Sequence, residues 1–298
     1  MNTSGAPAQS PGHRLREAVG QSAIMPVIGV YDAFSASLAA RHYDALFLSG
    51  FGFAASFYGL PDVGFITWSD MVSYVQRLRT ILPAHHLLVD IDDGYTDPDV
   101  ACHVVSVLEA SGASGVVLED QKRPRRCGHF DGKQVMELDE YLAKLRQVLA
   151  TRRDLFVIAR TDSTDPADVQ RRVLAFSEAG ADAVLVDGLP SLDTVRELSR
   201  KTTRPFCFNQ IAGGKSPPCT LAELREAGVK IVIYSTPCLF SAQAAIEDAM
   251  ADLKKADGSL SGSRVGAKDC TRILSDNLAR RAAPQLSVQA SDSPKPDS

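Results

Sequence analysis

The sequence lacks the features by which several classes of protein are recognised. None of its six cysteines stands in a Cys-x-x-Cys pair, which argues against closely spaced zinc ligands and against a redox disulfide. No apolar run approaches the roughly 18 residues that a membrane span requires. Residues 1–14 are rich in Ser, Pro, Gly and Ala and contain no apolar signal-peptide core. We therefore expect free thiols in a reducing compartment, a cytoplasmic protein and no membrane partner.

The chain also lacks an excess of basic residues. It has 32 Lys and Arg against 36 Asp and Glu, a net charge of −4, so no global cationic field is available to hold nucleic acid. We therefore expect no nucleic-acid partner. What the chain does have is the composition of a globular protein of enzyme size. Its 298 residues are 45% hydrophobic and 23% charged, which excludes the disordered, collagenous and coiled-coil classes.

Eight short apolar runs, each ending in polar residues, are predicted to be strands. They do not alternate with polar residues, which is the pattern of a parallel sheet that is buried on both faces. The predicted strands are residues 27–31, 45–49, 87–92, 115–120, 155–161, 183–187, 205–209 and 230–235.

Each predicted strand is followed by a segment of helical periodicity. Thr220 is expected to form a capping box with Glu223, and the other expected N-caps are Asp97, Asp165 and Ser191. Repeated strand and helix units, with no G-x-G-x-x-G turn after the first strand, predict an α/β fold of the (β/α)8 TIM barrel type. The predicted helices are residues 34–41, 71–82, 100–108, 141–149, 169–178, 192–198, 221–226 and 242–253.

The remaining segments lie outside this repeat. Residues 1–12 and 283–298 are rich in Ser, Pro and Ala and are predicted to be disordered tails of a catalytic barrel domain over 13–256. Residues 14–19 are expected to form a short helix that closes the bottom of the barrel. Residues 257–282 are predicted to be a linker with an extra C-terminal helix over 271–281.

Polar side chains gather at the ends of the predicted strands, where a barrel of this kind carries its catalytic groups. Ser, Asp and Asn at such positions also cap the next helix, so capping is an equal alternative for each residue taken alone. Because all eight strands end in this way, we expect an active site there. The residues are Tyr31, Asp32, Ser49, Gly50, Asp90, Asp92, Glu119, Asp120, Arg160, Asp162, Asp187, Asn209, Tyr234 and Ser235.

Three carboxylates among these residues predict a metal site. Asp90 and Asp92 are two residues apart, so on a strand their side chains point the same way, and Glu119 ends the next strand. Converging carboxylates repel each other unless a cation lies between them. Oxygen ligands of this kind suit Mg²⁺, or Mn²⁺, and do not suit zinc. The alternative is a loop in which the carboxylates form salt bridges with Arg123, Arg125 or Arg160.

Two connections are longer than the usual βα loop and overhang the predicted site, over residues 50–68 and 121–138. The second contains Cys127, Gly128 and His129 after cationic residues at positions 122, 123, 125 and 126. Such a run is usual in a solvated basic loop, but cationic neighbours also lower the pKa of a thiol and attract anionic substrates. Beside a metal site, Cys127 and His129 are candidate acid or base groups.

These residues resemble the signature of the isocitrate lyase and phosphoenolpyruvate mutase superfamily, in its methylisocitrate lyase-like branch. The resemblance covers residues from about 27 to 253, nearly all of the chain that is expected to be ordered. Its motifs are Leu118-Glu119-Asp120-Gln121, Pro124, Arg126-Cys127-Gly128-His129, Gly132-Lys133, Tyr31-Asp32-Ala33, Ser49-Gly50, Gly59-Leu60-Pro61-Asp62, Ile158-Ala159-Arg160-Thr161-Asp162, and Asn209 with Gly213-Gly214-Lys215.

The resemblance implies a barrel with a swapped C-terminal helix that binds Mg²⁺ together with a 2-oxo acid or its enolate. By position, the ligands around the metal are Asp90, Asp92 and Glu119. Ser49 and the Gly50 amide would hold the carboxylate of the oxo acid. Arg160 would stabilise negative charge, and Cys127 would be the proton donor. The remaining expected substrate contacts are Tyr31, Asp32, Asp62, Gly128, Asp187 and Asn209.

This chain departs from the lyases that it resembles at several positions. It has Asp187 and Ala212 where related lyases have glutamate, and Phe47 where some have a tyrosine that is a candidate base. Arg123 stands where an apolar or aromatic residue is usual. These changes suggest a substrate tail unlike that of isocitrate or methylisocitrate and favour a more anionic one. The identity of the general base stays open.

The first hypothesis is a Mg²⁺-dependent lyase that splits a carbon–carbon bond of a 2-hydroxy di- or tricarboxylic acid. Its small-molecule partner would be an anionic carboxylate. One alternative is phosphorus–carbon chemistry, as in phosphonomutases or carboxyphosphonoenolpyruvate mutases, which the Arg-rich connection over residues 121–138 favours. Hydrolysis of oxaloacetate is another. A barrel that only binds a metabolite is opposed by the joint presence of Asp90, Asp92, Glu119, Arg160 and Cys127.

The extra C-terminal helix predicts a homo-oligomer. Its apolar residues Ile273, Leu274 and Leu278 come after an eighth helix that is expected to close the ring, so they have no vacant place on their own barrel. We expect this helix to be swapped onto a partner in a tetramer built from dimers, which the resemblance also implies.

Overall fold

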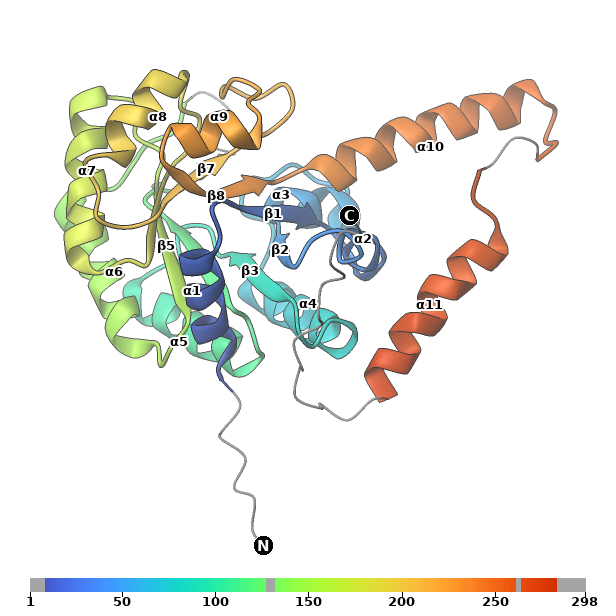
Figure 1. Ribbon diagram of the computed structural model, residues 1–298, viewed down its shortest axis with the longest axis horizontal. Coiled ribbons are helices and arrows are strands. Elements are labelled where there is room, and N and C mark those ends of the chain that lie inside the picture. The colour runs from blue at the N-terminus through green and yellow to red at the C-terminus, as the bar shows by residue number, and fades with distance from the viewer. Residues whose placement is uncertain (1–8, 127–131, 261–263, 283–298) are drawn as a thin grey trace, which may run out of the picture.

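The computed structural model describes residues 9–126, 132–260 and 264–282, which form a closed barrel with surrounding helices (Figure 1). The strands are parallel and paired in chain order, and the last strand pairs with the first, so the predicted (β/α)8 barrel is confirmed. They are β1 (Met25–Val30), β2 (Ala45–Leu48), β3 (His86–Asp90), β4 (Gly115–Glu119), β5 (Phe156–Thr161), β6 (Ala183–Val186), β7 (Phe206–Asn209) and β8 (Val229–Tyr234).

Apolar side chains fill both the barrel interior and the layer between strands and helices. Phe47, Ile158 and Ile233 belong to the buried cluster inside the barrel. Leu46 and Leu48, on either side of Phe47, belong to the cluster between the strands and the helices. Because both faces of each strand are buried, the strand sequences are continuously apolar and turn polar only at their ends.

Helices follow the strands as predicted. Each predicted N-cap accepts a hydrogen bond from the backbone amide three residues further on, and Thr220 and Glu223 form the expected capping box. The barrel helices are α2 (Ala33–Ala39), α4 (Trp68–Ile81), α5 (Pro98–Ala110), α6 (Leu138–Thr151), α7 (Pro166–Ala179), α8 (Leu192–Ser199) and α9 (Leu221–Glu226).

Helix α1 (Pro11–Gln21) closes the N-terminal end of the barrel, where Leu15 and Val19 join the interior cluster. It begins inside residues 1–12, so the predicted disordered tail is wrong for its last residues. Ser10 caps the helix, and Gly12 packs on residue 154 so closely that a Cβ would lie 2.0 Å from the carbonyl oxygen of Asp154. Composition alone cannot show such a contact, because it joins segments far apart in the sequence.

The connection after β2, predicted as a long loop over residues 50–68, contains helical structure. It begins with two short turns, α3 (Gly50–Phe53) and the π-helix η1 (Ala54–Tyr58). The ring of Phe53 stacks on that of Phe57, with centroids 5.0 Å apart, and leans against Tyr74 of α4. Gly59 then ends the turn with a φ of 65°, a left-handed conformation that suits glycine. The residues that follow return Asp62 to the strand ends.

The two C-terminal helices differ from the predicted arrangement. Helix α10 (Pro237–Lys255) contacts β1 and then projects away from the barrel without a buried residue (Figure 1). Helix α11 (Ala267–Ala282) returns to α2 and α4 of the same chain. There Ile273 is buried, and Asn277 donates a hydrogen bond to Ser37 Oγ at 2.8 Å. Helix α11 thus has contacts on its own barrel through Ile273 and Asn277, but Leu274 and Leu278 stay exposed, so its swap onto a partner stays a prediction.

Helices α10 and α11 leave apolar side chains exposed. Ile246 and Met250 lie one turn apart on α10 and are 60% and 56% exposed. Leu274 and Leu278 on α11 are also exposed. Over the described ranges, no helix combines the length and the apolar character that a membrane span needs. In the predicted oligomer, a partner subunit would therefore have to cover the apolar side chains of α10 as well as those of α11.

Candidate active site

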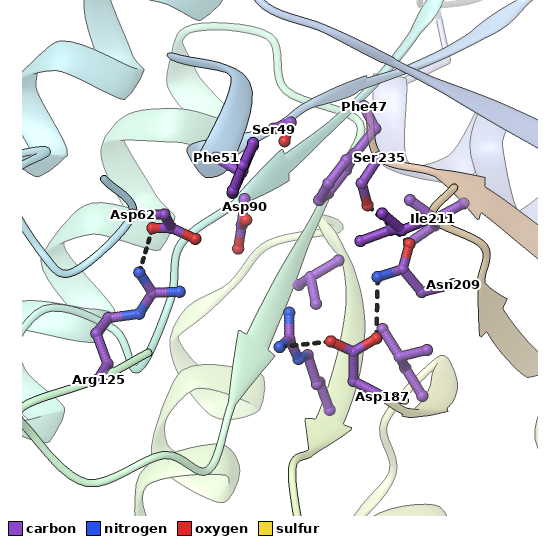
Figure 2. A pocket seen from close by; sticks show the side chains of 14 residues that line it. Phe47, Ser49, Phe51, Asp62, Asp90, Arg125, Asp187, Asn209, Ile211 and Ser235 are labelled. Atoms are coloured by element: carbon purple, nitrogen blue, oxygen red, sulfur yellow. Dashed lines mark hydrogen bonds and ion pairs between the residues drawn. The ribbon is translucent and has the colours of Figure 1, made fainter. Parts of the chain in front are cut away.

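Side chains from the strand ends surround a cavity at the C-terminal end of the barrel (Figure 2). The cavity is small, about 30 Å³, which leaves room for only a few water molecules. Its apolar lining is Phe47, Phe51, Val117, Leu185, Ile211 and Ile233. Its polar lining is Ser49, Asp62, Asp90, Arg125, Arg160, Asp187, Asn209 and Ser235.

Most of the predicted site residues come together in or next to this cavity. Ser49 lines it from the end of β2, and its Oγ accepts a hydrogen bond from the Gly52 amide at 3.2 Å. Gly50 donates its own amide to Asp90 Oδ2 at 3.3 Å. A Cβ at position 50 would lie 3.1 Å from that oxygen, so a side chain there would push against the Asp90 carboxylate.

Besides Gly50, the predicted substrate contacts Tyr31 and Asp32 lie outside the cavity lining. Asp32 caps helix α2, where its Oδ1 accepts the Ser35 amide at 2.6 Å, so the capping alternative describes this residue. Tyr31 is half-buried beside it. Cys127, Gly128 and His129, predicted to carry proton transfer and substrate binding, lie outside the described residues.

Arg125 is the centre of the acidic part of the site. Its guanidinium contacts three carboxylates, with Nη1 2.5 Å from Asp62 Oδ1, Nη2 2.9 Å from Asp92 Oδ1 and Nε 3.0 Å from Glu119 Oε1. The arginine is only 2% exposed. Burial would lower the pKa of Arg125, but the surrounding carboxylates raise it well above its usual value. The side chain is therefore a permanent cation inside the carboxylate cluster.

Asp90 and Asp92 enter this cluster from the end of a strand and from the turn that follows it, not from one continuous strand. Strand β3 ends at Asp90, and Asp92 has a φ of 51°, so the prediction that both side chains point the same way along one strand is wrong. Asp is one of the residues that tolerates this left-handed conformation. The Asp92 carbonyl accepts the Glu119 amide at 2.8 Å, which joins this turn to the end of β4.

The carboxylates suit a divalent cation in kind but not in their present arrangement. Burial raises the pKa values of Asp90 and Asp92, and that of Glu119 to about 7, which is the effect of removing charged oxygens from water. Asp92 Oδ1 and Glu119 Oε2 accept no well-directed hydrogen bond although guanidinium nitrogens lie close to both. Such oxygens are suitable ligands for Mg²⁺. Yet over the described ranges no three acidic, histidine or cysteine side chains are placed to hold one metal ion.

The salt-bridge alternative to the metal site therefore describes the contacts that are present. Arg125 pairs with Asp92, and Arg123 donates two hydrogen bonds to Asp93, each at 2.8 Å. The prediction that Asp90, Asp92 and Glu119 ligate a metal stays a prediction, and a cation would have to take the place of the Arg125 guanidinium.

Arg160 forms the second charged centre, at the end of β5. Its guanidinium lies 2.8 Å from Asp162 Oδ2, 2.8 Å from Asp187 Oδ2 and 3.3 Å from Glu119 Oε2. Burial would raise the pKa of Asp162, but Arg160 and Lys133 hold it below its usual value. Lys133 Nζ lies 2.9 Å from Asp162 Oδ1. These contacts fix the orientation of a fully charged guanidinium at the cavity wall.

A chain of hydrogen bonds continues from Arg160 across the cavity (Figure 2). Asn209 Nδ2 donates to Asp187 Oδ1 at 2.9 Å, and Ser235 Oγ donates to Asn209 Oδ1 at 2.7 Å. Asp187 is thus engaged by Arg160 and Asn209 within the protein. Asp187 stands where related lyases have the longer glutamate. Because it directly follows β6, its side chain still reaches Arg160 and Asn209.

The sequence named Arg125 only as one of three possible salt-bridge partners of the carboxylates, and it did not predict the apolar wall of the cavity. Ser235 stands in the strand-end inventory, which names it without a function. Arg125 is two residues before Cys127, but a cationic loop gives no local signal that one of its arginines is buried. The Gln121 side chain helps to place Arg125 at the site, because it binds the backbone of the next residue. Its Nε2 donates to the Arg126 carbonyl at 2.8 Å, and its Oε1 accepts the Arg126 amide at 2.9 Å. This pair of bonds ties the loop down beside the strand end.

Comparison with known proteins places the chain in a family. Residues 15–254 match the family described as phosphoenolpyruvate phosphomutase. The petal death protein of Dianthus caryophyllus is 35% identical over 250 residues, which are 82% of this chain and 77% of that protein. The 2-methylisocitrate lyase of Aeropyrum pernix is 34% identical over 232 residues, which are 76% of this chain and 75% of that enzyme.

Solved structures agree with this placement. The crystal structure of 2,3-dimethylmalate lyase has a TM-score of 0.86 at 30% identity and covers 92% of this chain and 95% of its own. Oxaloacetate acetylhydrolase in complex with 3,3-difluorooxalacetate has a TM-score of 0.85 at 30% identity, with coverage of 90% and 95%. The chain therefore belongs to the phosphoenolpyruvate phosphomutase family and is an enzyme of the isocitrate lyase and phosphoenolpyruvate mutase superfamily.

Proposed function

We propose that the protein is a Mg²⁺-dependent lyase that cleaves a carbon–carbon bond of a 2-hydroxy di- or tricarboxylic acid. The products would be a 2-oxo acid and a second carboxylic acid. Similar proteins named 2-methylisocitrate lyase and 2,3-dimethylmalate lyase support this reaction class. The observation that carries the proposal is the placement of Arg160, a buried guanidinium held by Glu119, Asp162 and Asp187 at the wall of the cavity.

The charge on Arg160 matches the chemistry of such a cleavage. Breaking the carbon–carbon bond beside a carboxylate develops negative charge, and a preorganised cation in a dry site stabilises that charge without having to reorient. Ser49 lines the same cavity and offers a hydroxyl to the carboxylate of an oxo acid. Cys127 is proposed to protonate the carbanion that the cleavage leaves.

The proposed metal ligands are Asp90, Asp92 and Glu119. A bound Mg²⁺ would neutralise these carboxylates and polarise the oxo group of the product. Gly50 contributes by orienting Asp90, because its amide donates to the Asp90 carboxylate. The left-handed backbone at Asp92 and the bond from the Glu119 amide to the Asp92 carbonyl hold the other two carboxylates beside each other.

Oxaloacetate hydrolysis is the second candidate, and the polar chain of Asp187, Asn209 and Ser235 favours it. These side chains face the cavity with hydrogen-bonding groups that could hold a water molecule or a hydrated carbonyl. Oxaloacetate acetylhydrolase is also among the similar structures. Phosphorus–carbon chemistry stays an alternative, although Arg123 and Arg125 of the cationic loop are paired with carboxylates.

A substrate panel separates these functions. Purified protein with Mg²⁺ should release glyoxylate, pyruvate or another 2-oxo acid from at least one member of a panel of 2-hydroxy di- and tricarboxylates. Release of oxalate and acetate from oxaloacetate would instead establish the hydrolase. A phosphorus-31 NMR change with phosphonopyruvate or a related compound would establish phosphorus–carbon chemistry. The lyase is rejected if no 2-hydroxy acid is cleaved while Mg²⁺ is bound.

We further propose that the protein assembles into a homo-oligomer, a tetramer built from dimers, and that α10 takes part in its interface. Ile246 and Met250 expose an apolar stripe on a helix that projects from its own barrel. Replacing both by aspartate is expected to shift the protein to a smaller species in multi-angle light scattering, because two buried charges would oppose the contact.

A matched control keeps the same change in charge. Lys255→Asp at the exposed end of α10 also lowers the net charge by about two, and it should leave the oligomer intact. Truncation from Gly266 onward, which removes α11, is expected to give smaller or aggregating species. A monodisperse full-length monomer would contradict the proposed assembly.

A further inference from the structure

The position of Arg125 conflicts with the proposed metal site. Its guanidinium lies among Asp62, Asp92 and Glu119, and two of these are proposed to ligate or surround Mg²⁺. A guanidinium and a divalent cation need the same carboxylate oxygens, so both cannot take these contacts at once. Either the metal binds elsewhere, or Arg125 has to leave when it binds.

The carboxylate cluster carries an excess of negative charge and therefore needs a cation whether or not a metal is bound. The carboxylates of the cluster outnumber the cationic groups that touch them. The carboxylates are Asp62, Asp90, Asp92, Glu119, Asp162 and Asp187, and the cations are Arg125, Arg160 and Lys133. Removing Arg125 without replacement would leave buried carboxylates unpaired, which is strongly unfavourable.

Arg125 also takes part in the wall of the cavity. It lines a cavity of about 30 Å³, which is far smaller than the volume that a small-molecule site requires. The Gln121 side chain holds the backbone of Arg126, so the Arg125 side chain is presented to the cluster from an anchored stretch of loop. A swing of this one side chain would vacate both the carboxylates and part of the cavity.

We propose that Arg125 is an internal counter-cation that occupies the carboxylate cluster in the metal-free enzyme and is displaced when Mg²⁺ binds. The metal and Arg125 then compete for Asp92 and Glu119, and metal binding opens the cavity to substrate. This inference rests on the proposed Mg²⁺ site but not on the substrate or the reaction. It makes the metal affinity of the enzyme weaker than its carboxylates alone would allow.

Metal titration tests the competition without a turnover assay. Calorimetry with Mg²⁺, and electron paramagnetic resonance with Mn²⁺, should show that Arg125→Gln binds metal about 10-fold or more tightly than the wild type. The matched control is Arg123→Gln, which removes the same charge from the neighbouring pair with Asp93. It should change the affinity by less than about 3-fold. Equal or weaker binding by Arg125→Gln overturns the proposal.

Thermal unfolding supplies a second readout. In EDTA, Arg125→Gln should melt below the wild type, and Mg²⁺ should raise its Tm by more than it raises that of the wild type. If Arg125→Gln does not fold without metal, Arg125→Lys replaces it. This variant keeps one charge but cannot contact three carboxylates with a planar fork, so it should bind metal more tightly than the wild type. An unchanged affinity in Arg125→Lys would count against displacement.

The wild-type protein provides an independent check. An arginine-specific dicarbonyl reagent, followed by peptide mass spectrometry, should modify Arg125 slowly in EDTA and several-fold faster with Mg²⁺, while Arg123 serves as the internal reference. Equal rates would overturn the proposal. Absence of any Mg²⁺ or Mn²⁺ binding to the wild type would instead remove the metal from the proposed function. Wild-type binding that Arg125→Gln does not strengthen would reject only the role of Arg125.

Discussion

Replacing Arg160 by lysine is expected to lower kcat/KM by at least about 100-fold while the barrel stays folded. Lysine keeps the charge but cannot hold Glu119, Asp162 and Asp187 with a planar fork of donors. The developing negative charge would then meet a cation in the wrong place. Steady-state kinetics on the substrate found in the panel, together with the Tm of the variant, measure the two effects separately.

The control for Arg160→Lys is a surface arginine. Arg171 pairs with Asp168 on α7, and its side chain is 62% exposed. Arg171→Lys should leave kcat and KM within about 2-fold of the wild type, because exposed ion pairs contribute little. Arg160→Lys with full activity would show that the buried guanidinium serves only to pair the surrounding carboxylates.

Replacing Cys127 by serine is expected to lower kcat by about 100-fold or more with little change in KM, the size of a general acid's contribution. The reason is that a hydroxyl is a much weaker acid than a thiol, so it transfers the proton to the carbanion more slowly. Stopped or continuous assays of product release measure both constants. Cys270→Ser on α11 is the matched control and should behave as the wild type.

Thiol labelling gives the second test of Cys127. An alkylating reagent should modify Cys127 before the other cysteines, and an oxo acid with Mg²⁺ should protect it. Cys207 should resist throughout, because it is buried and burial raises the pKa of its thiol. Rapid labelling elsewhere, or no protection, would contradict the assignment of Cys127 as the proton donor.

Much of the fold was predictable because its signals are local. The eight strands begin and end within two residues of their predicted positions, since each is a short apolar run between polar residues. Caps such as Thr220 were predictable for the same reason, because a cap and its partner lie three residues apart. The strand-end rule also placed Ser49, Asp90, Arg160, Asp187 and Asn209 at the cavity, because the carboxyl ends of parallel strands meet at one end of a barrel.

Only the tertiary structure shows which charged side chains pair with each other and which helices pack on each other within the chain. Arg125 and Arg126 are neighbours in one cationic run, yet Arg125 is buried among carboxylates and Arg126 is exposed. Asp92 reaches the cluster through a left-handed turn, and α11 packs on α2 and α4, which precede it by more than 180 residues. Each of these outcomes depends on contacts between residues far apart in the chain. Local periodicity and composition carry no record of such contacts, because charge pairing and burial depend on distances in space.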